Sequence, residues 1–439
     1  MLAAGRGERR AEIAVRLWEG LGDILEQRTQ HEEALQAYRN AQAQVPHGDR
    51  IWQARLHRKA GAVMREQRRY AETLDACRQA EAALDRQPVE DGSHWWAEWI
   101  EVQLEQVWAH YWLAQWLEMD NLVNKVQPVV QERGGAASRM RLLMASCLMH
   151  LRRDRYTVSD EMLADAREAL ALGREWGGPK NRIECQFELG FLHLWRRELT
   201  EAKENLLATL ELAATSGILT LRTLSLTYST VSCRFRGQTV GVLDSVMRAH
   251  EAAQAAHMPD YVAAAKANQA WLASRRQDLP RAQKLGQEAL AIWRQSPLVY
   301  PFQWQALWPL IGVALAGGRE DEAWAYAQAL LEPMQQRLPD ALNTALTAAV
   351  QANAEDQTGA ARRQLDRAMA LARELGYLWW TPGSHDVWRP AKAQCVQCLA
   401  GLRRAFAARR NPVLFFPADS SCQTPGETLC KRWLLYDDF

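Results

Sequence analysis

The stretch WEGLGDILEQRTQHEEALQAYRNAQAQVP, residues 18–46, decides the fold. Small and large side chains recur in it at fixed spacing, at Trp18, Leu21, Gly22, Ala34, Tyr38, Ala41 and Pro46. Gly22 and Ala34 let two helices approach closely, and the larger side chains fill the space around that contact. Pro46 ends the second helix because it has no backbone N–H to donate. The spacing therefore predicts a pair of antiparallel helices.

The same pattern recurs along the chain, which is the signature of a repeat architecture. A second copy, with Gly61 and Ala80, follows the first by about 40 residues. Further copies, more degraded, contain Gly190 with Ala202 and Leu206, Ala270 with Ala282 and Ala289, Gly312, and Ala349 to Gly376. Between them, residues 95–119 and 140–172 carry apolar side chains at helical spacing. We predict an all-α, right-handed superhelical solenoid of about nine antiparallel helix pairs, with a repeat of about 40 residues.

The predicted solenoid spans residues 8–378, and the chain changes character after it. Residues 379–439 match no repeat. We expect one further helix there, over 391–410, followed by a loosely ordered tail.

Composition excludes several classes of protein. Of 439 residues, 48% are hydrophobic and 24% are charged, which is typical of a folded domain and excludes extensive disorder. The formal net charge is +1, so no overall field favours nucleic acid or an anionic membrane. No apolar run is long enough to span a bilayer, and no export signal precedes the first repeat. We therefore expect a cytoplasmic protein that binds neither a membrane nor nucleic acid directly.

In its repeats the chain resembles tetratricopeptide-repeat proteins, and more narrowly the C-terminal repeat arm of bacterial STAND-type signalling ATPases linked to cyclases, kinases or transcription activators. The stretches that carry the resemblance, besides residues 18–46, are RDRYTVSDE at 153–161, ELGFLHLWRRELTEAKE at 188–204, SPLVYPFQW at 296–304, RLPDAL at 337–342 and ALARELGYL at 370–378. The chain departs from such ATPases in having no G-x-x-x-x-G-K-[ST] phosphate-binding loop.

The resemblance implies a non-catalytic scaffold or sensor arm in a signalling system, with no cofactor. Its partner would be a protein or effector, with a STAND-type ATPase or another signalling domain as one possibility. Proteins of this type bind partners on the concave face, which the first helix of each pair lines. The repeat register places there two sets of charged residues and one aromatic set: Glu19, Asp23 and Glu26; Arg55, Arg58 and Arg65; and Phe187, Phe191 and Trp195.

Each set has a second interpretation. The acidic and basic residues either clamp an extended peptide through charge-assisted hydrogen bonds or form an ordinary solvated face. The aromatic residues either line a hydrophobic groove or show that the superhelix closes on itself at that point.

An enzymatic alternative rests on tryptophan and glutamate residues. The chain has 19 Trp, among them Trp95, Trp99, Trp108, Trp112 and Trp116 at helical spacing. Such a stripe is typical of core packing, but it can also bind a flat ligand or a sugar. Carboxylates at Glu98, Glu101 and Glu105 beside it would then act on a sugar or an isoprenoid, provided that two of them face one another across a cavity.

The cysteines do not predict a metal site. Cys395 and Cys398 are followed by Cys422 and Cys430, which gives four possible zinc ligands. The second pair is spaced too widely for a zinc ribbon. We therefore predict no metal ligands and no catalytic residues.

Overall fold

The computed structural model describes residues 2–46, 48–85, 92–238 and 242–378, which form eighteen α-helices. Their bounds are α1 Leu2–Gln27, α2 His31–Gln42, α3 Arg50–Glu66, α4 Tyr70–Leu84, α5 Ser93–Trp112, α6 Trp116–Arg133, α7 Ala136–Arg153, α8 Asp160–Glu175, α9 Pro179–Trp195, α10 Leu199–Ser216, α11 Leu219–Phe235, α12 Val242–Ala255, α13 Pro259–Arg275, α14 Leu279–Gln295, α15 Trp304–Ala316, α16 Glu320–Leu330, α17 Asp340–Ala354 and α18 Thr358–Glu374. The helix and tail predicted after residue 378 lie outside the described residues.

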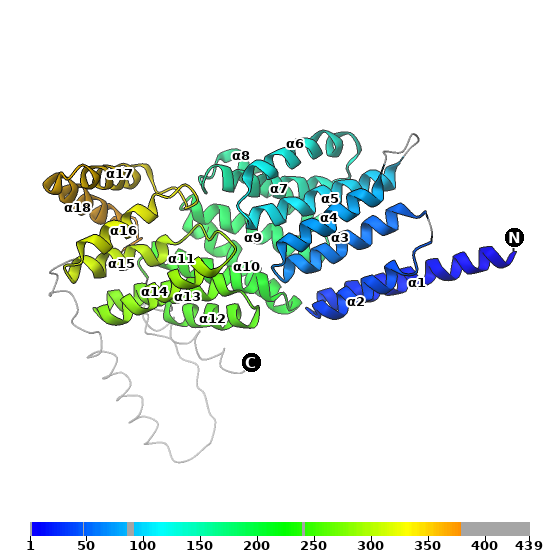
Figure 1. Ribbon diagram of the computed structural model, residues 1–439, viewed down its shortest axis with the longest axis horizontal. Helices are drawn as coiled ribbons and strands as arrows, with labels where there is room; N and C mark the ends of the chain where they lie inside the picture. The colour runs from blue at the N-terminus through cyan, green and yellow to red at the C-terminus, as the bar shows by residue number, and fades with distance from the viewer. Residues whose placement is uncertain (1, 47, 86–91, 239–241, 379–439) are drawn as a thin grey trace, which may run out of the picture. The chain divides into compact units, whose positions relative to one another are not determined.

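The helices stack as nine consecutive antiparallel pairs, from α1–α2 to α17–α18 (Figure 1). Each helix packs on the next one in sequence. Most odd-numbered helices also contact the next odd-numbered helix, as α3 does with α5 and α5 does with α7. The first helices of the pairs therefore form the inner layer of the superhelix, and the second helices cover it. The predicted all-α solenoid of helix pairs is confirmed.

One turn geometry joins the two helices of every pair. A residue in the left-handed conformation ends the first helix, at Thr29, Arg68, Ala114, Arg155, Arg197, Gly237, Gln277, Gly318 and Asp356. The next residue donates its backbone N–H to a carbonyl five residues back, as Arg69 does to Met64 at 2.9 Å. Successive positions lie 38 to 46 residues apart. This spacing confirms the predicted repeat of about 40 residues.

The superhelix closes on itself after about half of the described chain. Arg155 donates from Nε to the carbonyl of Gln335 at 2.8 Å, and Arg197 donates from Nη1 to the carbonyl of Leu375 at 2.9 Å. Arg68 forms an ion pair with Asp260 on α13. All three arginines occupy the left-handed turn position of their pair. Each therefore contacts the layer one superhelical turn further along the chain.

The first pair has a free apolar face. Ile13, Leu17, Leu21 and Ile24 follow one another at three- and four-residue steps along α1, and each is at least 41% exposed. In the interior of a repeat array the preceding pair covers this face. Here nothing in the described part of the chain does.

The close approach predicted at Gly22 is present in the first pair. Gly22 faces the ring of Tyr38, and a Cβ at this position would lie 2.4 Å from that ring. Ala34 is fully buried nearby, and the Tyr38 hydroxyl donates to Asp23 at 2.8 Å. The absence of a side chain at Gly22 therefore determines how closely α1 and α2 pack.

We predict opposite effects of the same substitution at two glycines of α1. Gly22→Ala should destabilise the first pair by about 1–3 kcal/mol, because the methyl group collides with the buried Tyr38 ring. Gly20→Ala should stabilise it by about 0.5–1 kcal/mol, because alanine favours the helix and no atom lies within 4 Å of the added carbon. Hydrogen exchange of the α1 and α2 amides measures both changes. Equal effects of the two substitutions would contradict the packing described here.

Candidate ligand-binding site on the inner face

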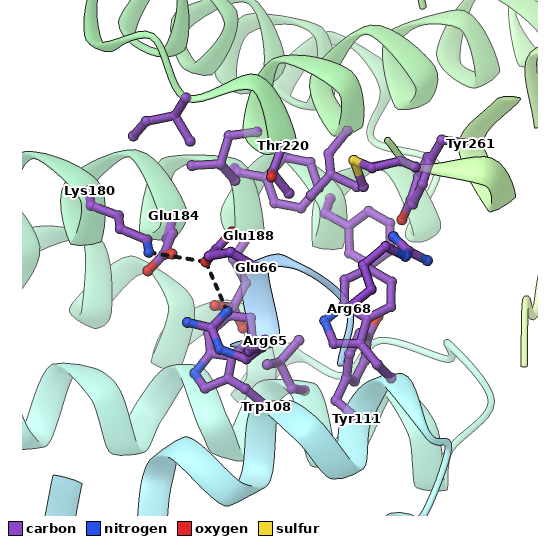
Figure 2. Close-up of a pocket in the computed structure, with 18 of the residues that line it drawn as sticks. Arg65, Glu66, Arg68, Trp108, Tyr111, Lys180, Glu184, Glu188, Thr220 and Tyr261 are labelled. Atoms are coloured by element: carbon purple, nitrogen blue, oxygen red, sulfur yellow. Dashed lines mark hydrogen bonds and ion pairs between the residues drawn. The ribbon is translucent and has the colours of Figure 1, made fainter. Parts of the chain in front are cut away.

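A cavity of about 90 Å³ lies inside the superhelix (Figure 2). Residues of α3, α5, α7, α9, α11 and α13 line it, so six inner helices contribute to one site. Its aromatic lining comprises Tyr70, Trp108, Tyr111, Trp112, Phe187, Phe191, Tyr228 and Tyr261. Its charged lining comprises Arg65, Glu66, Arg68, Lys180, Glu184 and Glu188.

A wider cavity of about 1070 Å³ adjoins the first one. The two share five lining residues, which are Glu66, Arg68, Lys180, Ile218 and Thr220. The wider cavity extends to α1 and α2, where Asp23, Glu26, Glu32 and Glu33 line it. The two cavities are therefore neighbours that share part of their lining, with the acidic residues on the outer one and the aromatic residues on the inner one.

Helix α9 supplies the largest share of the charged lining. Lys180, Glu184 and Glu188 are spaced four residues apart, so they follow one face of this helix. Pro179 occupies the first turn, where its missing N–H costs nothing. Gly190 on the same helix packs so tightly on α10 that a Cβ would lie 2.9 Å from Cβ of Asn205. This contact with α10 helps to hold α9 in place beside the cavity.

Glu66 is the centre of an ion-pair chain that crosses the cavity wall. Its carboxylate lies 3.0 Å from Nζ of Lys180 and 3.3 Å from Nη1 of Arg65, as the dashed lines in Figure 2 show. Burial alone would raise the pKa of Glu66, but these two cations outweigh it and lower the pKa to about 2. Lys180 also lies 3.3 Å from Glu26, so it links α9 to both α1 and α3.

An arginine–glutamate ladder joins the inner helices α3, α5 and α7. Arg58 donates from Nε to Glu98 at 2.5 Å, and Arg65 donates from Nε to Glu105 at 2.6 Å. Arg141 on α7 bridges Glu101 and Glu105. Burial opposes ionisation of Glu98 and Glu105, but the arginines outweigh it and hold the pKa of each carboxyl below its usual range.

The arginine–glutamate ladder bears on the enzymatic alternative, which requires two of the three glutamates to face one another across a cavity. Glu98, Glu101 and Glu105 point to arginines, and none of them lines the two cavities. They do not form a pair of carboxylates that face one another across a cavity. Trp108 and Trp112 line the inner cavity, whereas Trp95 is buried and stacks on Trp99 with their centroids 6.4 Å apart.

Aromatic side chains form the part of the core next to the cavity. Trp195 stacks on Phe302, with ring centroids 4.5 Å apart, and Phe191 meets Tyr228 edge to face at 4.6 Å. Phe302 and Trp195 belong to distant repeats. The superhelix therefore closes on itself at Trp195, as one of the two interpretations of this aromatic set predicted.

The structure distributes the nine residues predicted for partner binding over three places. Arg65, Phe187 and Phe191 line the inner cavity. Asp23 and Glu26 line the wider one. The other four, which are Glu19, Arg55, Arg58 and Trp195, line neither, and the three charged ones form ion pairs within the chain. A role in partner binding stays a prediction for all nine.

Sequence reasoning missed four charged residues of the inner cavity: Arg68, Lys180, Glu184 and Glu188. The spacing of the last three along α9 was visible, and Glu188 opens a stretch that carries the family resemblance. What the spacing did not reveal is that this face of α9 meets α3 and the turn after it.

No family model matches the chain, and no curated protein matches it. Solved structures do. A Rap protein complexed with competence and sporulation factor is 12% identical, with a TM-score of 0.54 over 73% of this chain and 98% of that one. NprR in complex with its cognate peptide NprX is 11% identical, with a TM-score of 0.50 over 82% and 99%. A STAND protein with a tetratricopeptide-repeat sensor from Pyrococcus horikoshii is 15% identical, with a TM-score of 0.42, over 72% of this chain and 47% of that one.

These similarities define the class of protein at the level of fold. The chain has a tetratricopeptide-like helical-repeat fold, which it shares with the Rap protein and NprR. At such identities the likeness concerns the fold alone.

The low pKa of Glu66 predicts a pH dependence. The stabilisation that ionised Glu66 provides is complete above its unfolded pKa of about 4.3, and it is lost as the pH falls toward 2. Glu66→Gln should therefore cost up to about 3 kcal/mol near neutral pH and progressively less below pH 4. Urea unfolding of both proteins between pH 7 and pH 3 measures this difference.

Glu132, whose side chain is 69% exposed, provides the control. Glu132→Gln should change the free energy of unfolding by less than about 0.5 kcal/mol at every pH. A cost of Glu66→Gln that stays constant from pH 7 to pH 3 would show that its charge does not stabilise the fold.

Proposed function

We propose that this protein is a non-catalytic interaction module that binds an extended peptide segment of its partner along the inner face of the superhelix. The observation that carries the proposal is the pair of adjacent cavities, which share five lining residues. The outer part, at about 1070 Å³, has room for several residues, and the inner part, at about 90 Å³, has room for a single side chain. A peptide presents both a backbone and separate side chains, and so matches this division.

The lining also suits a peptide chemically. Aromatic side chains supply contact area at little cost in conformational entropy, and the charged residues that rim them can orient polar groups. The inner helices that carry these residues hold one another through buried ion pairs and aromatic contacts. The site is thus largely formed before a ligand binds, which lowers the ordering cost of binding.

Two of the solved structures support the same proposal. One holds a Rap protein with competence and sporulation factor, and the other holds NprR with its cognate peptide. Because this chain shares its fold with both proteins, we propose that it also binds a peptide.

We further propose that the peptide belongs to a signalling system and that the module works as its sensor arm or scaffold in a bacterial cytoplasm. The family resemblance of the repeats supports this assignment and makes a STAND-type ATPase one candidate partner. None of the described helices combines the length and apolar character of a bilayer-spanning segment.

Selection from a phage-displayed library of random twelve-residue peptides tests the proposed function. We expect peptides that bind the whole chain and that lose at least about tenfold in affinity for Thr220→Trp. Thr220 lines both cavities, so an indole at this position would take up space in either one. Isothermal titration calorimetry measures the affinities.

Thr215→Trp is the matched control, because Thr215 is exposed near the end of α10 and lines neither cavity. It should leave binding unchanged. A selection that yields no binder, or binders that tolerate Thr220→Trp as well as Thr215→Trp, would overturn the proposed function.

A further inference from the structure

Among the described residues, Glu188 is a buried carboxylate without an ion-pair partner. Its side chain lines the inner cavity, and the residue is only 5% exposed. No described group donates to either carboxylate oxygen with the geometry of a hydrogen bond, and the Cys147 thiol, which lies near enough to lower the pKa of Glu188, donates to the carbonyl of Met162 at 3.5 Å. A buried charged or polar group that lacks a partner costs free energy, so such groups are rare in folded proteins.

Glu184 adds a second carboxylate one helical turn away. It lines the same cavity and, in the described part of the chain, has no hydrogen bond or ion pair within 4.0 Å. Burial raises the pKa of both carboxyl groups. For Glu188 the Cys147 thiol opposes this shift and the charge of Glu184 adds to it, and for Glu184 the charges of Lys180 and Arg65 oppose it. Figure 2 shows both residues on α9 beside the ion-pair chain of Glu66.

The cations of the cavity are engaged elsewhere. Arg65 binds Glu105, Lys180 binds Glu66 and Glu26, and Arg68 binds Asp260. These pairs hold three cations in place on the wall of the cavity. Neither Glu184 nor Glu188 has a described cation within 4.0 Å, so a basic group that entered the cavity would meet two carboxyl groups free to ionise and pair with it.

The aromatic lining favours a cation as well. The guanidinium of Arg65 lies 5.5 Å from the Trp108 ring centroid, and that of Arg68 lies 5.4 Å from the Trp112 centroid. The wall thus already holds two guanidinium groups against indole faces. Phe187 and Phe191, next to Glu188 along α9, stack at 5.6 Å and carry no such cation among the described residues.

The wider cavity beside the inner one has a mainly acidic lining, which suits a basic ligand. The wider cavity is lined by five acidic residues, Asp23, Glu26, Glu32, Glu33 and Glu66, and by three basic ones, Lys59, Arg68 and Lys180. An acidic cleft raises the local concentration of a basic ligand and speeds its association. The inner volume of about 90 Å³ then limits what can enter to one side chain.

We propose that the inner cavity is a specificity pocket for one arginine or lysine side chain of the bound peptide, with Glu188 and Glu184 as the residues that pair with its charge. This proposal rests on the proposed function, since it names the chemistry that the same site selects. The positive group would lie between the two carboxylates and the rings of Phe187 and Phe191. The rest of the peptide would occupy the wider cavity.

Neutral isosteres in the peptide test the proposal on the unmodified protein. We expect the selected peptides to share a basic residue at one position. Replacing it with citrulline, or with acetyl-lysine where it is lysine, should weaken binding at least about 30-fold in isothermal titration calorimetry. The same replacement at any other basic position should change affinity by less than about threefold.

A double-mutant cycle then assigns the contact to Glu188. The Glu188→Gln variant should bind the basic peptide more weakly than the unmodified protein does. Replacing the basic residue of the peptide with its neutral isostere should then change the affinity of this variant little, because the charge pair is already lost. Glu204→Gln, at an exposed position of α10 outside both cavities, should behave like the unmodified protein. Thermal unfolding checks that Glu188→Gln folds, and we expect its Tm to be equal or higher, since glutamine has the same size and removes a buried ionisable group without an ion-pair partner.

The outcomes separate this proposal from the proposed function. Selected peptides that share no basic position, or that tolerate the neutral isostere, overturn the specificity pocket and leave peptide binding intact. A library without binders overturns peptide binding itself. Free agmatine that binds as tightly as the basic peptide would assign the pocket to a small molecule and so overturn the peptide as its occupant.

Discussion

The ion pair between Arg68 and Asp260 is the contact on which the inner site depends, because it joins α3 and its following turn to α13 across the superhelix. Together with the pairs of Lys180 with Glu66 and Glu26, this junction holds the residues of the early repeats against those of α9, α11 and α13. Asp260 is 2% exposed, and its backbone carbonyl accepts from Nε1 of Trp293 at 2.9 Å. A buried ion pair is costly to break on one side only, since the other charge is then left without compensation. Removing either charge of this pair should therefore destabilise the closed superhelix.

The superhelix is held by different forces on the two sides of the cavity. The inner helices α3, α5 and α7 meet through arginine–glutamate pairs such as Arg58 with Glu98. Beyond α9, rings such as Trp195 and Phe302 pack on one another instead. The ion pairs make the interface between the early inner helices polar, whereas the rings make the later one apolar. The cavity lies where these two kinds of packing meet, and it takes its charged and aromatic lining from both.

The local features of the fold could be predicted from the sequence, because each helix pair is a contiguous segment with its own markers. Gly22, Tyr38 and the repeat of about 40 residues were visible in this way. The site could be predicted only in part, since Arg65, Phe187 and Phe191 belong to the inner helices of recognisable repeats. Its remaining residues depend on which repeats meet after one superhelical turn. That depends on small rotations accumulated over many pairs, and no single stretch of sequence encodes them.

The distribution of counter-ions gives the site its chemical character. Lys180, Glu184 and Glu188 form a stripe on α9 that would look balanced on an isolated helix, because a cation stands one turn before the carboxylates. In the folded chain Lys180 turns to Glu66 and Glu26 on the earlier repeats, at 3.0 and 3.3 Å. In the closed superhelix Lys180 therefore pairs with the earlier repeats and not with the carboxylates of its own helix. The same closure buries Glu188. Closure of the superhelix therefore leaves two carboxyl groups in the cavity without a described cation to pair with. The group that we propose to pair with them is a basic side chain of a bound peptide.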